Sequence, residues 1–135
     1  MASFVKFQPF VEALSEKVHN LGSDQIVVAL TNTAPNATDA TLSQISEISY
    51  TNCSTRNVTT TSSAQTSGTY KLVLTDLTLT ASGAVGPFRY VVLYNDTSTS
   101  DNLICYFDAG SNITLQSGDT YILDFDATSG ILTLA

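Results

Sequence analysis

Charged side chains are scarce in this 135-residue chain and make up 13% of it, about half of their usual share. There is no tryptophan, a single histidine and only two cysteines. One histidine and two separated cysteines cannot supply the four ligands of a typical zinc site. We therefore expect no metal site of the histidine or cysteine type.

Catalytic motifs are also missing. His19 lies near the end of an expected helix, where a cation interacts favourably with the helix dipole, so we interpret it as a helix-end residue. The chain has no Gly-x-Ser-x-Gly motif, no P-loop and no Gly-x-Gly-x-x-Gly motif. We expect neither a Ser-His-Asp catalytic triad nor a Cys-His catalytic pair. The sequence favours a non-enzymatic protein without a cofactor.

Basic residues are too few and too scattered for nucleic-acid binding. The formal net charge is −7, and phosphate contacts need clustered Lys or Arg. No apolar run approaches the length of a membrane span, and we expect no signal peptide. The basic residues are Lys6, Lys17, Arg56, Lys71 and Arg89.

The cysteines and acidic residues leave two alternatives open. Cys105 lies in an apolar run and Cys53 in a polar one, so a disulfide is possible but not implied, and reduced thiols fit assembly in a cytoplasm. Asp124 and Asp126 loosely resemble a calcium loop, but the closing Glu is absent. We interpret these two residues as the solvent face of a strand.

What the chain does contain is one strand pattern after another. Short β-branched and aromatic runs alternate with turn residues, which is typical of an antiparallel sheet protein. We predict a mainly β fold, an antiparallel β-sandwich or jelly roll with one N-terminal α-helix. The predicted strands are 25–31, 57–65, 69–75, 77–81, 88–94, 102–108, 112–115, 120–126 and 131–134.

One helix is predicted at the N-terminus, over residues 4–21, with Gly22 just past its end. Its apolar stripe is Phe4, Phe7, Val11, Leu14, Val18 and Leu21. Pro9 is tolerated only in a first turn, so a second start for the regular helix, near Gln8, stays open. The stripe either packs on the sandwich or docks a neighbouring subunit, and Phe10 looks exposed. We predict a single domain over 1–135, with a helix or arm over 1–22 and a β-sandwich over 23–135.

Three further segments carry specific predictions. Residues 120–126 alternate, with Tyr121, Leu123 and Phe125 on one face. Residues 126–130 are predicted to turn that strand back into residues 131–134 as a hairpin. Residues 88–94 are apolar on both faces apart from Arg89, as in a central strand or one at a subunit interface. One or two helical turns are expected within residues 41–48.

Five segments together carry a family resemblance: His19–Asp24, Val28–Pro35, Ser67–Leu74, Gly86–Asp96 and Gly118–Leu134. They resemble a family of small virion proteins of tailed bacteriophages. Residues 50–56 depart from the glycine-rich stretch that we associate with that family. The resemblance covers almost the whole chain, but its motifs are turns and strands, so no catalytic residue carries over.

The resemblance implies a capsid decoration or cement protein on the virion surface, assembled in the host cytoplasm. Its partner would be the major capsid protein, and we expect a homo-oligomer, a trimer or a dimer. A tail, baseplate or fibre component is one alternative. A carbohydrate-binding adsorption module is another, with Tyr70, Tyr90, Tyr94 and Tyr106 as a candidate strip. The candidate partner-binding residues are Phe4, Phe7, Phe10, Asn57, Thr59, Thr61 and Arg89.

Overall fold

The computed structural model describes residues 3–135 and is mainly β, with antiparallel sheets and one α-helix. This confirms the predicted fold class, while the jelly roll stays a prediction. The helix α1 spans Gln8–Ser15, and a 3-10 turn at Leu42–Gln44 lies where helical turns were expected. The strands are β1 (Ser3–Lys6), β2 (Ile26–Thr31), β3 (Asn57–Val58), β4 (Thr60–Thr66), β5 (Thr69–Leu74), β6 (Leu77–Thr80), β7 (Val85–Asn95), β8 (Leu103–Leu115), β9 (Thr120–Leu123) and β10 (Leu132–Leu134).

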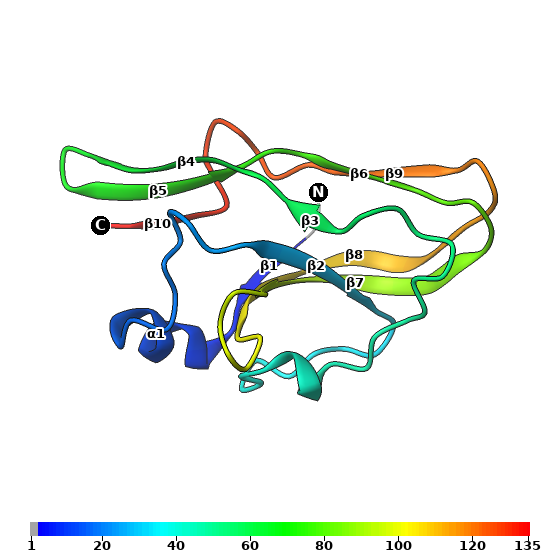
Figure 1. The fold of residues 1–135 in the computed structure, drawn as a ribbon, viewed down its shortest axis with the longest axis horizontal. Coiled ribbons are helices and arrows are strands. Elements are labelled where there is room, and N and C mark those ends of the chain that lie inside the picture. Colours follow the sequence, from blue (N-terminus) through cyan, green and yellow to red (C-terminus); the bar gives the residue numbers. More distant parts are fainter. Residues whose placement is uncertain (1–2) are drawn as a thin grey trace.

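The strands form two layers (Figure 1). One layer is a five-stranded sheet in the order β1-β8-β7-β2-β3. The other contains a three-stranded sheet, β10-β5-β4, and a two-stranded sheet, β6-β9. Buried residues from both layers belong to one apolar core, which holds the layers together.

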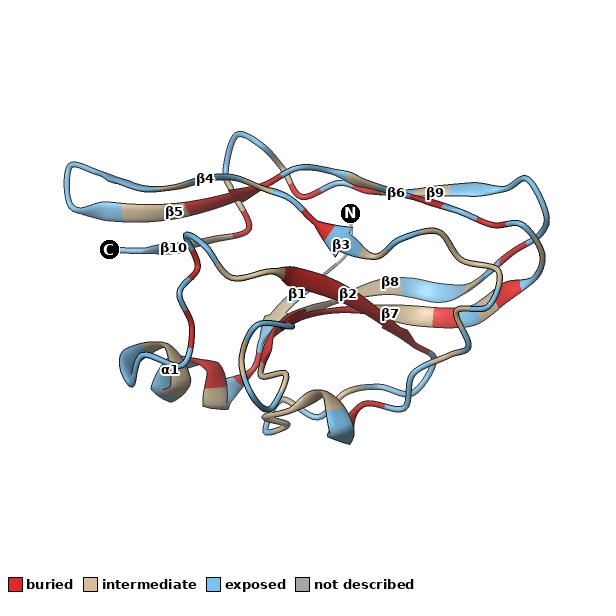
Figure 2. Cartoon of the chain, in the orientation of Figure 1, coloured by how far each residue is buried: buried red, intermediate tan, exposed pale blue. Residues whose placement is uncertain are grey.

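The five-stranded sheet is covered on both faces. Every residue of β2 is buried (Figure 2), and β7 is buried from Val91 to Asn95. Figure 1 shows α1 and the loops between β2 and β3 on the side away from the second layer. The residues 88–94 therefore belong to a central strand, one of the two alternatives that the sequence left open, because a strand covered twice needs apolar residues on both sides.

The predicted N-terminal helix is too long at both ends. Phe4 to Lys6 belong to β1, which pairs with β8, and the helix begins at Gln8, as the position of Pro9 had suggested. Its end is set by Lys17 instead of Gly22. Lys17 has φ 72, and the hydrogen bonds from Val18 N to Ala13 O and from Lys17 N to Leu14 O close a Schellman motif.

His19 therefore does not lie at the helix end, and that interpretation is wrong. The residue follows the Schellman motif and is 6% exposed. The apolar stripe also differs from the prediction, because the buried helical residue is Phe10, while Val11 is 48% exposed.

The C-terminal hairpin was also predicted wrongly. The alternation of residues 120–126 is confirmed, with Leu123 and Phe125 buried and Ile122 and Asp124 exposed. However, β9 pairs with β6, and β10 pairs with β5. Residues 124–131 thus connect two different sheets of the same layer.

Two of the predicted strands form one strand in the structure, and another predicted strand is divided in two. Residues 102–108 and 112–115 form a single strand, β8, with an irregular pairing to β7 around Gly110. Residues 57–65 divide at Thr59 into β3, which joins the five-stranded sheet, and β4, which lies in the other layer. The chain therefore crosses between layers at Thr59.

Candidate interaction surface

Two of the predicted partner-binding residues are core residues. Phe7 is 0% exposed and its ring lies 5.2 Å from that of Tyr106. Phe10 is 3% exposed and its ring lies 5.0 Å from that of His19. The prediction that these rings dock a partner is wrong for the folded chain, because both are already packed within it.

The remaining candidates do not form one patch. Phe4 is 44% exposed on β1, at one edge of the five-stranded sheet, whereas Asn57 is exposed on β3 at the opposite edge. Thr59 and Thr61 are exposed beside Asn57, and β4 is an edge strand of the three-stranded sheet. The structure therefore offers two separate candidate surfaces.

Arg89 is occupied within the chain. Its Nε and Nη2 atoms donate to the two carboxylate oxygens of Asp108, at 2.8 and 3.1 Å. Asp108 also accepts a hydrogen bond from Gly110 N. The Arg89 hydrogen bonds, with that of Gly110, hold the pKa of Asp108 below its ordinary value. A partner would have to compete with this bidentate pair for the guanidinium group.

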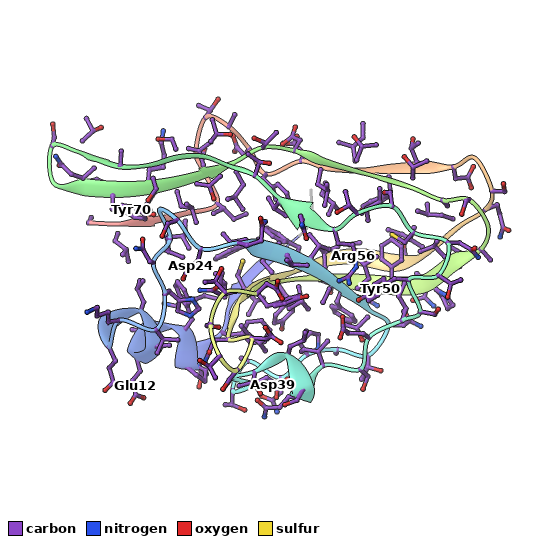
Figure 3. The ribbon with its side chains drawn as sticks, in the orientation of Figure 1. Glu12, Asp24, Asp39, Tyr50, Arg56 and Tyr70 are labelled. Atoms are coloured by element: carbon purple, nitrogen blue, oxygen red, sulfur yellow. The ribbon has the colours of Figure 1, made fainter. Side chains whose placement is uncertain are left out.

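The outer edge of β2 beyond β3 is closed by residues 46–56. Leu30 N donates to Tyr50 Oη at 2.9 Å, and Ile48 N donates to Leu30 O. Arg56 donates to Val28 O and lies over the Tyr50 ring, 3.6 Å from its centroid (Figure 3). Burial raises the pKa of Tyr50. These residues satisfy backbone groups that would otherwise offer a pairing edge.

The opposite edge of the same sheet is open. Phe7 N donates to Ile104 O in β8, and the backbone groups of successive strand residues point to alternate sides. Those of Phe4 and Lys6 therefore point away from β8. No strand pairs with β1 on that side within the described residues.

An apolar groove runs beside this open edge, between the two layers. It consists of three hollows of about 250, 390 and 170 Å³ that share lining residues with their neighbours. We call this surface the aromatic groove. Its central residues are Phe4, Phe107, Phe125, Ile131 and Asp124.

The aromatic groove contains a row of rings, of which Phe4 is 44% exposed, Phe107 is half-buried and Phe125 is buried. The centroids of Phe4 and Phe107 are 5.5 Å apart, and those of Phe107 and Phe125 are 6.5 Å apart. Ile122, in the outer hollow, is 62% exposed. Such exposed aromatic and aliphatic groups in a recess are typical of protein-binding surfaces.

The four tyrosines considered for carbohydrate binding do not share a surface. Tyr94 is buried, and Tyr70 lies in the other layer, where its hydroxyl hydrogen-bonds Ser63 at 2.7 Å. Tyr90 and Tyr106 contact each other edge to face. A continuous strip of stacking rings is therefore not formed.

The structure also bears on the remaining sequence candidates. Cys53 and Cys105 are both free thiols, and burial raises the pKa of the Cys105 thiol. Residues 3–135 hold no group of three His, Cys, Asp or Glu side chains close enough to share a metal ion. In the same range, none of the helical segments is long and apolar enough to cross a bilayer.

A scan against protein-family models and searches of curated proteins and of solved structures find no match for this chain.

The sequence predicted Phe4 as a partner residue but not the groove around it. Phe107 lies opposite Phe4 because β8 pairs with β1. Phe125 and Ile131 come from two other segments, and the pairing of β9 with β6 and of β10 with β5 brings them to the groove. The one local signal was the apolar face of residues 120–126, which ends in Phe125.

Proposed function

We propose that this protein is a non-enzymatic virion structural protein of a tailed bacteriophage. It binds the outer surface of the head as a decoration protein and bridges neighbouring major capsid subunits. The resemblance of five sequence segments supports the virion assignment. The aromatic groove beside the open β1 edge is the observation that supports protein binding.

The groove suits a partner that brings an extended segment. The free N–H and C=O groups of Phe4 and Lys6 can extend the sheet by one strand. The rings beside them would then receive apolar side chains of that segment, and buried aromatic groups of this kind often contribute most of the binding energy. Asp124 lies at the groove, so a partner segment with a Lys or Arg there is favoured.

Attachment at many places on a lattice reinforces weak individual contacts. A protein that touches two or three subunits at once gains from a high effective concentration at the second contact. A dimer or trimer of this chain, which we also propose, would bring two or three grooves to the shell.

The test compares two substitutions of exposed apolar residues. Phe4→Ser removes a ring from the groove, and Val11→Ser removes an equally exposed side chain from α1. Each purified protein is added to heads that lack it, and bound copies per particle are counted by mass measurement. We expect Val11→Ser to bind as the wild type does, and Phe4→Ser to bind at least about fivefold more weakly, since an interface hot spot contributes more than about 1 kcal/mol.

The possible outcomes of this experiment test the docking surface, the location on the particle and the virion assignment in turn. Equal binding of the two variants would exclude the groove as the docking surface. Wild-type protein bound to tails instead of heads would replace the proposal by the tail, baseplate or fibre alternative. No binding to any part of the particle would overturn the virion assignment itself.

A further inference from the structure

His19 lies in a hydrogen-bonded cluster that joins the segment after α1 to the end of β7. Its Nδ1 atom lies 3.0 Å from Nδ2 of Asn95, and the same Asn95 amide donates to Oδ2 of Asp24 at 2.7 Å. Asp24 also accepts a hydrogen bond from Asn20 N at 2.8 Å. Residues 76 positions apart in the chain are thus tied together.

The orientation of the Asn95 amide fixes the protonation of the histidine. Oδ1 of Asn95 accepts from Thr97 N and Ser98 N, at 2.9 and 3.1 Å. The NH2 group must therefore face His19 and Asp24, and it can only donate. His19 Nδ1 is then an acceptor, so the ring is neutral and carries its proton on Nε2.

A doubly protonated His19 ring does not fit this cluster. A second proton on Nδ1 would point an N–H group at the N–H group of Asn95, and Asn95 cannot turn over without giving up Thr97 and Ser98. Nε2 is itself buried without a partner among residues 3–135. The folded cluster therefore provides a hydrogen-bond acceptor for neither proton of an imidazolium.

The charged and titratable groups around the ring act in opposite directions. Asp24, on the same segment, attracts a cation, whereas Lys17, which lines the adjoining cleft, is itself positively charged. Tyr70 of β5 lines the same cleft, and Asp96 follows Asn95 in the chain. Burial outweighs the attraction of Asp24 and lowers the pKa of His19 below 6.5.

We propose that His19 is a proton-sensitive latch, which holds residues 17–25 against the end of β7 while neutral and releases them when its Nδ1 is protonated. Figure 3 shows Asp24 on this segment between α1 and Tyr70. The segment forms one wall of a cleft of about 420 Å³, whose other walls include Leu14, Tyr70 and Leu134. Its release uncovers Leu21 and Phe10, which are buried in the closed state.

The linkage predicts how strongly acid opens the segment. The open form binds a proton with the ordinary affinity of histidine, and the closed form binds it more weakly. The opening constant therefore rises as pH falls below about 6.5, by up to tenfold for each pH unit, until the lowered pKa of the closed form is reached.

The experiment uses the full chain and its single histidine, whose Cε1–H resonance is unambiguous in NMR. Nitrogen shifts of the ring report the tautomer, and amide hydrogen exchange reports opening after correction for intrinsic rates. The reporting amides are Val18, Ser23 and Asp24, and Val28 in β2 is the reference. We expect an Nε2–H tautomer, a midpoint below that of the unfolded chain, and protection that falls with acid only in the reporting amides.

Two variants separate the latch from general acid sensitivity. His19→Asn keeps an acceptor at the δ1 position and cannot be charged, so its reporting amides should show no pH dependence between pH 7 and 5. Asp24→Asn removes the attracting carboxylate and should lower the His19 midpoint further. A proton on Nδ1 in the wild type, an unshifted midpoint, or the same acid opening in His19→Asn would each overturn the latch. If His19→Asn does not fold, the wild-type tautomer and the Asp24→Asn midpoint decide.

Discussion

Lys17 holds a backbone conformation that suits glycine. Its φ of 72 lies in the left-handed region, where a side chain crowds the following carbonyl and costs about 1–2 kcal/mol. The Schellman hydrogen bonds that end α1 require this conformation. Sequence reasoning placed the helix end at Gly22, because glycine is the usual residue in the left-handed conformation that ends a helix, whereas lysine rarely adopts it.

Replacing Lys17 by glycine should stabilise the protein. We expect Lys17→Gly to raise the free energy of unfolding by about 0.5–1 kcal/mol, since relief of the left-handed strain exceeds the greater flexibility of unfolded glycine. Urea denaturation followed by circular dichroism measures the change. Lys17→Ala removes the same charge but keeps the strain, so it is the control and should give no gain. Equal effects of the two variants would mean that charge, and not conformation, matters here.

Among the elements, the N-terminal strand and helix show where the pattern misled. Phe4 and Phe7 are three residues apart, which fits a helix, but Phe4 lies within β1 and Phe7 directly follows it, and their rings lie on opposite faces of the sheet. Only pairing with β8 decides between these conformations, and pairing partners are not encoded locally. By contrast, β2 was predicted to within one residue and the stretch 88–94 of the longer strand β7 was predicted, because long apolar and β-branched runs have few alternatives.

A pair of phenylalanine truncations tests this arrangement. Phe7→Ala should lower the free energy of unfolding by about 3–5 kcal/mol, the usual cost of deleting a buried ring. Phe4→Ala should cost far less, because its ring is 44% exposed. Urea denaturation measures both changes in the free energy of unfolding, provided that the slope of the transition is the same in each variant. A helix over residues 4–21, with both rings on one packed face, would instead give similar losses.

For the whole molecule, the connection between β9 and β10 decides where the surface groove lies. The turn signals at residues 126–130 suggested a hairpin. However, Phe125 N donates to Asp76 Oδ1, and Asp126 adopts a φ of 49 and caps Thr128 and Ser129. The chain is thereby directed to β5 instead of back along β9. The sequence could predict the strands but not this crossing, because the contact with Asp76 spans 49 residues.

The free energy of unfolding should fall in two separate steps as the pH is lowered. The pKa of His19 is lowered, so unfolding takes up a proton there, and stability falls as pH drops below about 6.5. The pKa values of Asp108 and Asp126 are also lowered, the first mainly by Arg89 and the second by the backbone N–H of Ser129. Their stabilisation is present above 3.8 and is lost only as pH falls below that value.

Urea unfolding at closely spaced pH values separates the two losses. We expect His19→Asn to remove the upper loss of stability, which begins below about pH 6.5, and to leave the lower one, which begins below pH 3.8. Arg89→Gln should weaken the lower loss and leave the upper one, since the pKa of Asp108 then returns towards 3.8. The two sites share no hydrogen-bond partner, so the effects of the two substitutions should add in the double variant, which lacks the upper loss and shows a weakened lower one. A wild-type curve that is flat from pH 7 to 5 would show that the folded and unfolded chains bind equal numbers of protons there, against the neutral state that Asn95 imposes on His19.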